Sequence, residues 1–308
     1  MGNSGQFPDE QSEEGDFRRQ EDAFRNWVSA SEGKGDHPVE SGRYHLYVSL
    51  ACPWAHRSLI VRNLSGLELS VPMEVVDPER DERGWAFREG EGHGPDRLNG
   101  FEFLSEAYRA SDPDFSGRVT VPVLWDSQLK RIVNNSEDDI CRMFQREFAD
   151  LRTTGTDLFP QGIEREHSEL ADYIYEHINN GVYEAGFASK QSVYENAVGK
   201  LFKALDTIET RLQRSGPYLF GDRIVEADWR LFCTLIRFDA VYHGHFKCNL
   251  RRIVDYPHLQ AHTEALYRVP GVADTVNFDH IKGHYYRTHD EINPTRIVPV
   301  GPAQQWQA

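Results

Sequence analysis

The pattern of apolar and polar positions in the first part of the chain predicts short strands around one well-defined helix. Residues 44–49 form an aromatic and β-branched run that predicts a strand, and the segment that begins at Pro53 predicts a helix, because proline suits a first helical turn. Residues 69–76 predict a second strand. The pattern then weakens over residues 77–116, which we interpret as a long charged connection anchored by the apolar side chains of residues 84–87.

Two further strands and a helix follow this connection. Residues 118–125 and 129–133 predict adjacent antiparallel strands. Pro122 lies within the first of them, and since proline cannot donate a ladder hydrogen bond, we expect it at a sheet edge or after a cis peptide bond. Asn134-Asn135-Ser136 predicts the cap of a helix that runs through Phe144. The order of these elements is typical of a thioredoxin-like α/β domain.

The second half of the chain has the periodicity of helices. Residues 163–178 and 192–212 predict two helices, and residues 179–187 are interpreted as a break between them. A further apolar helix is predicted to begin at Glu226-Ala227-Asp228, and Pro257 and Pro270 punctuate the remaining helices. The second predicted helix carries an apolar stripe of Val198, Leu201, Phe202, Leu205, Ile208 and Leu212. This half is therefore predicted to be all-α.

These patterns divide the chain into segments of different kinds. Residues 1 to about 16 are polar and acidic and are predicted to be disordered, and the aromatic residues Phe17, Phe24 and Trp27 indicate a docked arm or helix. The predicted segments are an acidic tail and N-terminal arm (1–39), a thioredoxin-like thiol-binding domain (40–150), a linker (151–162), an all-helical domain (163–290) and a C-terminal extension (291–308).

Composition narrows the class of protein. The chain has 308 residues and a formal net charge of -15 at pH 7, which disfavours binding to nucleic acid or to anionic membrane surfaces. No apolar run reaches the length of a membrane span, and the N-terminus lacks the pattern of a secretory signal. Four cysteines without a repeating short spacing indicate a reducing compartment, so a cytoplasmic location is predicted. The excess of 49 acidic over 34 basic residues suggests a salt-adapted organism.

Cys52 is the candidate nucleophile. It is expected at the turn between the first strand and the first helix, where unpaired backbone N–H groups and the helix dipole stabilise a thiolate. The alternative is a buried and inert cysteine, which is the interpretation of Cys141 and Cys233 on their apolar helical faces. Because Ala55 stands at the third following position, no local cysteine can resolve a disulfide on Cys52, and an external thiol must do so.

Several long strings in the chain together resemble one known family. They include Cys52-Pro53-Trp54-Ala55, Gly84-Trp85, Thr120-Val121-Pro122-Val123-Leu124, Asn179-Asn180-Gly181-Val182-Tyr183, His243-Gly244-His245-Phe246-Lys247-Cys248-Asn249 and His280-Ile281-Lys282-Gly283-His284-Tyr285-Tyr286. Over roughly residues 40–302 the chain resembles the glutathionyl-hydroquinone reductases, the omega-like Xi class of glutathione transferases. The resemblance implies a thioredoxin-like N-terminal domain, an all-α hydroquinone-binding C-terminal domain and a homodimer.

The resemblance also implies a reaction and its catalytic residues. Cys52 would attack the thioether sulfur of a glutathionyl-hydroquinone, releasing hydroquinone and leaving a mixed disulfide that a second thiol resolves. Tyr183 resembles the family's proton donor to the departing aromatic carbon. Tyr242 and Tyr285 resemble two tyrosines whose hydroxyls bind the cysteine sulfur, which would lower the pKa of the thiol.

The thiol site implied by the resemblance departs from the family pattern at one point. The site comprises Trp85, Arg118, Val119, Thr120, Val121, Pro122, Ser136 and Glu137. Where the family usually has Glu-Ser, this chain has Ser136-Glu137, which moves the carboxylate by one position, about 100° around the helix. We expect γ-glutamyl recognition, with glutathione or γ-glutamylcysteine as co-substrate and no metal.

Other functions remain open from the sequence. A general thioltransferase or dehydroascorbate reductase would use Cys52 without a tyrosine proton donor, and a non-catalytic module binding hydrophobic ligands would need no thiolate. Conjugation of glutathione to electrophiles fits poorly, because it needs a hydroxyl where this chain has cysteine.

His243, His245 and Cys248 have metal-ligand residue types, with His280 or His284 as a fourth ligand, but we interpret them as a family signature. Each tyrosine above could also serve packing alone.

Overall fold

The computed structural model describes residue 10, residues 12–31 and residues 35–303. Most of the predicted acidic tail (residues 1–9 and 11) and the end of the C-terminal extension (304–308) lie outside the described residues, as do residues 32–34. Contacts divide the chain into two compact units. The sheet unit comprises Glu21–Asp157 and Asp274–His284, and the helical unit comprises Met1–Gln20, Leu158–Ala273 and Tyr285–Ala308.

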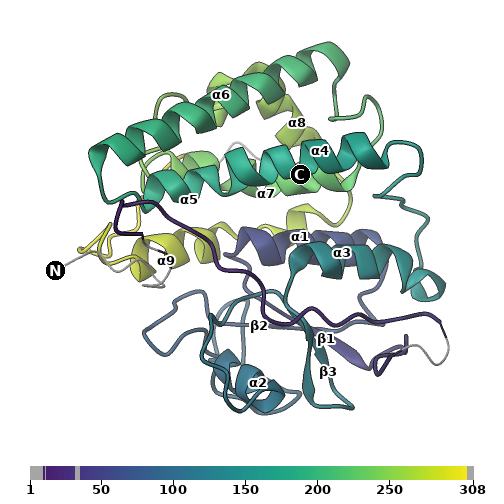
Figure 1. The fold of residues 1–308 in the computed structure, drawn as a ribbon. Coiled ribbons are helices and arrows are strands. Elements are labelled where there is room, and N and C mark those ends of the chain that lie inside the picture. The colour runs from purple at the N-terminus through teal and green to yellow at the C-terminus, as the bar shows by residue number, and fades with distance from the viewer. Residues whose placement is uncertain (1–9, 11, 32–34, 304–308) are drawn as a thin grey trace. The chain divides into compact units, whose positions relative to one another are not determined.

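The sheet unit has the predicted thioredoxin-like order of elements. Its four-stranded sheet has the order β2-β1-β3-β4, with β2 parallel to β1 and the other neighbouring pairs antiparallel. Figure 1 shows α1 and α3 on one face of this sheet and α2 on the other. The bounds are β1 Tyr44–Val48, α1 Pro53–Leu64, β2 Met73–Val75, α2 Leu104–Ser111, β3 Val123–Asp126, β4 Arg131–Asn134 and α3 Glu137–Arg146, followed by the short 3-10 turn η2 Ala149–Leu151.

Two strand boundaries and one helix in the sheet unit show how the structure departs from the sequence prediction. The second strand begins at Met73 and not at residue 69, because a turn precedes it in which Leu69 is 93% exposed. β3 begins after Pro122, whose preceding peptide bond is cis, so the second of the two alternatives for this proline is confirmed. The connection over residues 77–116 contains α2, which buries only Leu104, Ala107 and Tyr108 and so gives too short an apolar pattern to recognise.

The N-terminal arm is docked and extended, and the helix considered for it is absent from the described residues 12–31. The main chain of Asn26 donates to the Val133 carbonyl of β4 at 3.0 Å. Phe24 exchanges two hydrogen bonds with Asn135: its N–H donates to Asn135 Oδ1 at 2.8 Å, and its carbonyl accepts the Asn135 N–H at 3.0 Å. The arm therefore covers the edge of the sheet that β4 would otherwise expose.

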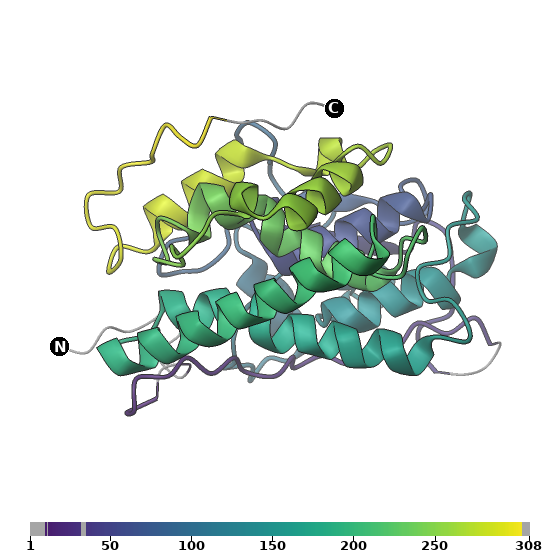
Figure 2. The ribbon, with the colours of Figure 1, turned by 90° about the horizontal axis from the view of Figure 1, so that it is seen from above.

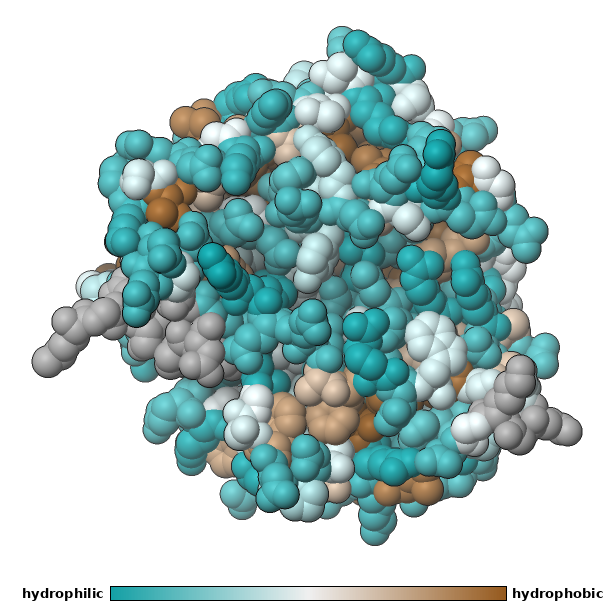
Figure 3. Space-filling model, viewed as in Figure 1, coloured by the Kyte–Doolittle hydropathy of each residue, from teal (hydrophilic) through white to brown (hydrophobic). Residues whose placement is uncertain are grey.

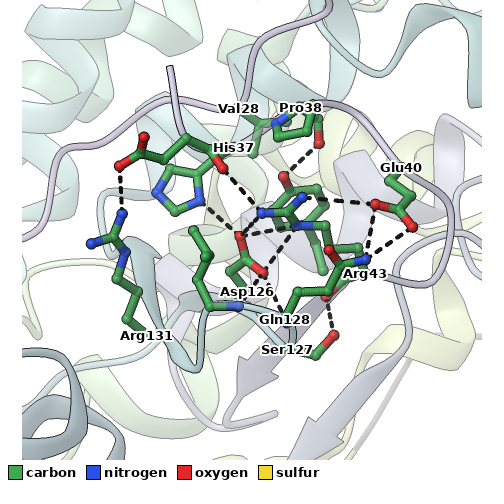
Figure 4. Close-up of polar contacts among 12 residues, drawn as sticks. Val28, His37, Pro38, Glu40, Arg43, Asp126, Ser127, Gln128 and Arg131 are labelled. Carbon is green, nitrogen blue, oxygen red and sulfur yellow. Dashed lines mark hydrogen bonds and ion pairs between the residues drawn. The ribbon is translucent and has the colours of Figure 1, made fainter. Parts of the chain in front are cut away.

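A buried polar network fixes the turn between β3 and β4 (Figure 4). The fully buried carboxylate of Asp126 accepts hydrogen bonds from Arg43 Nη2 at 2.6 Å and from His37 Nδ1 at 2.8 Å. It also accepts the main-chain N–H groups of Gln128 and Leu129 in the turn. Burial alone would raise the pKa of Asp126, but the hydrogen bonds from Arg43 and His37 lower it. Asp126 thus stays charged and joins the turn to the end of the arm.

The helical unit contains the predicted helices with shifted ends. Its bounds are α4 Glu164–Ile174, the π-helix η3 Tyr175–Asn179, α5 Gly181–Gly186, α6 Gln191–Ser215, α7 Glu226–Arg237, the π-helix η4 Phe238–Tyr242, η5 Ile253–Asp255 and α8 Pro257–Tyr267. The last two elements, η6 Ala273–Thr275 and α9 Phe278–Thr288, both cross a boundary between the units. In Figure 2, α6 lies alongside α4 and α5. Every residue of the apolar stripe predicted for α6 is buried, so that prediction is confirmed.

The predicted break over residues 179–187 is wrong. The chain stays helical there, through η3 and α5, and Tyr183 lies on a helix and not in a loop. The reason is a tertiary contact: the buried amide of Asn179 donates to the Arg230 carbonyl at 3.0 Å and to Thr234 Oγ1 at 2.7 Å. The side-chain nitrogen of a residue that favours turns thereby finds two acceptors inside the helical unit.

Hydrophilic side chains predominate on the face of the molecule seen in Figure 3. In the described part of the chain, none of the helices combines the length and the apolar composition that a transmembrane span requires.

Candidate active site

Cys52 occupies the predicted turn between β1 and α1. It is the N-cap of α1, with extended backbone angles, and Pro53 is the first helical residue. The first turn of α1 contains no acidic residue, so no carboxylate there opposes a negative charge on the sulfur. The half-buried thiol lies with Sγ 3.6 Å from the carbonyl oxygen of Val121. The position is that of a cysteine whose thiolate a helix N-terminus favours.

The loop that precedes β3 faces this thiol and is held by side chains behind it. Tyr108 Oη donates to the Thr120 carbonyl at 2.9 Å and accepts the Thr120 N–H at 3.1 Å. Asn135 Nδ2 donates to Thr120 Oγ1 at 3.2 Å. Arg118 and Val119, half-buried, lead into this loop, and the cis Val121–Pro122 bond follows Thr120. The loop therefore presents the Val121 carbonyl to Cys52 in a fixed position.

The N-terminus of α3 carries Ser136 and Glu137, both buried. Ser136 is the N-cap, as predicted, although its side chain makes no capping hydrogen bond; its N–H donates to Asn134 Oδ1 at 2.7 Å. Glu137 pairs with Arg57 of α1 at 3.0 Å, and the same guanidinium nitrogen contacts Asp138 at 2.5 Å. The shifted carboxylate thus has a cationic partner within the sheet unit.

Trp85 packs against a segment distant in sequence. Its ring stacks on that of His284, with centroids 5.0 Å apart and planes 21° apart, and only 5% of Trp85 is exposed. His284 Nδ1 donates to the Pro78 carbonyl at 2.7 Å. Trp85 therefore anchors its own loop to residues 274–284, and its contact with a thiol stays a prediction.

The three tyrosines singled out in the sequence meet within the helical unit. Tyr183 Oη lies 2.5 Å from Tyr285 Oη, which lies 3.0 Å from Tyr242 Oη. Tyr242 is 0% and Tyr285 2% exposed. Burial, and then the neighbouring Tyr183, raise the pKa values of Tyr242 and Tyr285 well above that of a free phenol. These two hydroxyls consequently remain protonated and able to donate.

Four residues of these sites were not recognised from the sequence as site residues: Tyr108, Asn135, Arg57 and Arg19. Asn135 belongs to the predicted cap, but only the structure shows its bond to Thr120. Arg19 lies over the Tyr183 ring, with its guanidinium carbon 5.1 Å from the ring centroid. Tyr108 lies in the connection where the sequence gives little signal. None of these contacts joins residues close enough in sequence to produce a recognisable local motif.

Most of the remaining candidate side chains pack in the interior, whereas His243 is half-buried. Cys141 and Cys233 are buried, as predicted for core residues. His245 Nε2 lies 3.1 Å from His289 Nδ1, and Cys248 Sγ lies 4.0 Å from the Val182 carbonyl oxygen. Among the residues that the structure describes, no three or more His, Cys, Asp or Glu side chains form a group able to hold a metal ion.

Comparison with known proteins identifies the family. Residues 51–147 match the model of the glutathione S-transferase N-terminal domain, and residues 191–265 match that of the C-terminal domain. The glutathionyl-hydroquinone reductase YqjG of Escherichia coli (strain K12) is 47% identical over 305 residues, which cover 97% of this chain and 92% of the relative.

Solved structures agree with this match. A Xi class glutathione transferase from Natrialba magadii superposes with a TM-score of 0.90 at 47% identity, covering 92% of this chain and 87% of that one. The glutathione-bound structure of Escherichia coli YqjG superposes with a TM-score of 0.88 at 47% identity, covering 92% and 94% of the two chains. With near-complete coverage, the same two-domain architecture and a cysteine at the first helix, the chain belongs to the glutathionyl-hydroquinone reductases, the Xi class of glutathione transferases.

Proposed function

We propose that this enzyme reduces glutathionyl-hydroquinones to hydroquinones at the expense of a thiol. The observation that carries the proposal is Cys52 at the N-terminus of α1, beside the Val121 carbonyl, in a chain whose relatives are glutathionyl-hydroquinone reductases. A module that only binds hydrophobic ligands has no use for a thiolate at that place.

The reaction has two steps. The Cys52 thiolate attacks the thioether sulfur, so that a sulfur–sulfur bond forms and the sulfur–carbon bond to the ring breaks. The aromatic carbon takes the electron pair of the broken bond and a proton from Tyr183, which makes the hydroquinone. A second thiol then attacks the mixed disulfide, restores Cys52 and leaves as a disulfide. The hydroxyls of Tyr242 and Tyr285 are the proposed ligands of the Cys52 sulfur.

Glutathione is the favoured thiol, because solved relatives bind it. The proposed contacts are Trp85, the segment Arg118, Val119, Thr120, Val121 and Pro122, and Ser136 with Glu137. Arg118 would hold a carboxylate of the tripeptide, and Glu137 the ammonium of its γ-glutamyl end. γ-Glutamylcysteine keeps that γ-glutamyl end, so a comparison of the two thiols in the same assay decides between them.

The proposal extends to the setting of the enzyme. We expect a homodimer in a reducing cytoplasm, without nucleic acid or membrane partners, which the net charge of -15 supports. Light scattering on the purified protein measures the oligomeric state. We also expect salt adaptation, and a free energy of unfolding that fails to rise between low and molar potassium chloride would contradict it.

The test is the Cys52→Ser variant with glutathionyl-menadiol as substrate. Its turnover should be abolished, whereas Cys141→Ser, a buried cysteine beside Ser58, should retain it. Mass spectrometry of the parent enzyme mixed with substrate and no further thiol should find one thiol adduct on Cys52. Substantial turnover by Cys52→Ser would contradict the covalent mechanism. The Tyr183→Phe variant distinguishes a general thioltransferase. In that case the substitution would reduce activity with glutathionyl-menadiol and with a simple mixed disulfide by the same factor.

A further inference from the structure

The proposed proton donor is one end of a chain of three phenols. Tyr183 on α5, Tyr285 on α9 and Tyr242 on η4 are joined in that order by contacts of 2.5 Å and 3.0 Å between their hydroxyl oxygens. The rings of Tyr242 and Tyr285 pack edge to face, with centroids 5.5 Å apart. This packing and the burial of both rings hold the hydroxyls of Tyr242 and Tyr285 in contact with each other, with Tyr285 next to Tyr183.

A cation covers the face of the Tyr183 ring. The guanidinium carbon of Arg19 lies 5.1 Å from the ring centroid, and Arg19 Nε donates to Asn180 Oδ1 at 2.9 Å. Asn180 immediately precedes α5, the helix that carries Tyr183. Phe17, two residues before Arg19, stacks on the same ring at 6.2 Å. The N-terminal arm therefore places one positive charge against this phenol.

A phenol that gives up its proton becomes a phenolate, and both features stabilise that form. A hydroxyl has one hydrogen, so Tyr183 can offer its own to a substrate only if Tyr285 donates to Tyr183 and not the reverse. Tyr242 can then donate to Tyr285, which strengthens the bond to Tyr183. Burial keeps Tyr242 and Tyr285 protonated, as their raised pKa values indicate. The guanidinium attracts the ring more strongly when the ring carries negative charge.

We propose that Tyr285, Tyr242 and Arg19 are positioning residues for the proton that Tyr183 gives, stabilising its phenolate from the hydroxyl and from the ring face. The inference rests on the proposed function. The proton leaves Tyr183 for the aromatic carbon as the sulfur–carbon bond breaks, and it is replaced by the proton of the second thiol, whose thiolate attacks the mixed disulfide. Tyr285 and Tyr242 each have a single hydrogen, so their proposed donation to the Cys52 sulfur belongs to the free thiolate before attack, and the bond to Tyr183 belongs to the step in which the proton leaves.

The experiment compares the pH dependence of kcat for glutathionyl-menadiol among Tyr285→Phe, Arg19→Gln and the parent. Tyr183 must be protonated to act, so kcat falls at high pH. Loss of a bond or charge that stabilises the phenolate should move this basic limb up by about one pH unit and lower the maximal kcat about tenfold. Arg19→Lys should recover most of the loss. Tyr286→Phe, which removes a hydroxyl that donates to the Ala240 carbonyl, is the matched control and should leave the limb in place.

A second measurement separates the two roles of Tyr285. If Tyr285 serves the sulfur alone, Tyr285→Phe slows the reduction of a simple mixed disulfide as much as the reduction of glutathionyl-menadiol. That result, or an unmoved basic limb in both variants, overturns the inference. Arg19 lies on the arm and is only half-buried, so Arg19→Gln gives an answer even if Tyr285→Phe does not fold. Failure of the parent to turn over glutathionyl-menadiol would instead refute the proposed function itself.

Discussion

Asn135 joins the N-terminal arm to the loop that faces Cys52, and its replacement by alanine tests that connection. The side chain is 3% exposed and takes part in three hydrogen bonds: from the Phe24 N–H at 2.8 Å, to Thr120 Oγ1 at 3.2 Å and to Tyr108 Oη at 3.3 Å. A neutral hydrogen bond contributes about 1 kcal/mol net. The free energy of unfolding of Asn135→Ala should therefore fall by about 3 kcal/mol.

The same variant should weaken thiol binding, because the loop carrying Thr120 and Val121 loses one of its supports. A loss of about 1 kcal/mol at the loop corresponds to about a fivefold rise in KM for the thiol. Thr120→Val tests the support of the loop separately, because it removes the Oγ1 acceptor and leaves the hydrogen bond between Asn135 and Phe24. This variant should raise KM for the thiol with a smaller loss of stability. Urea unfolding gives the stability, and initial rates with varied glutathione give KM.

The reasoning fails if the free energy of unfolding of Asn135→Ala lies within about 0.5 kcal/mol of that of the parent, since a buried side chain cannot lose three hydrogen bonds at so small a cost. If the free energy of unfolding falls by the expected amount while KM for the thiol is unchanged, only the predicted effect on thiol binding is refuted. In that case Asn135 would support the arm and the sheet without affecting the thiol site.

Three further perturbations concern buried ionisable side chains. Arg43→Met leaves the fully buried Asp126 without its guanidinium and should lower the free energy of urea unfolding by about 3–5 kcal/mol. An additional Asp126→Asn change should recover part of this loss, and no recovery would contradict the pairing. Glu137→Gln should raise KM for glutathione about tenfold with less change in kcat, and equal KM values would remove Glu137 from the thiol site. Burial lowers the pKa of His245 from 6.5 to about 4. As the pH falls, His245 is therefore protonated in the unfolded chain before it is protonated in the folded chain. The free energy of unfolding of the parent should thus drop by about 3 kcal/mol more than that of His245→Gln between pH 6.5 and 4, and parallel curves would contradict this.

The features that sequence reasoning located depend on local chemistry. A strand, a chain reversal and Pro53 within a few residues place Cys52 at a helix N-terminus, and the geometry of proline restricts Pro122 to few arrangements. The stripe of α6 was visible because a helix of 25 residues repeats its apolar period many times. Each of these signals lies within one continuous stretch of the chain.

The features that sequence reasoning missed depend on contacts between distant segments. The N-terminal arm pairs with β4 through main-chain groups, and no side-chain pattern encodes those bonds. Asn179, Asn180 and Gly181 have low helix propensity, so a break was expected before Tyr183. The bonds of Asn179 to Arg230 and Thr234 outweigh that preference. The chain of phenols likewise brings together residues from three separate elements.

The division of the chain has a consequence for chimeric enzymes. The chain changes from one unit to the other after Gln20, Asp157, Ala273 and His284, so neither unit is encoded by one continuous stretch. A crossover at the linker alone would combine residues 21–157 of one parent with residues 274–284 of another, and would likewise separate residues 12–20 from the helices to which they belong. Functional recombinants within this family should therefore be those that inherit residues 21–157 and 274–284 from the same parent.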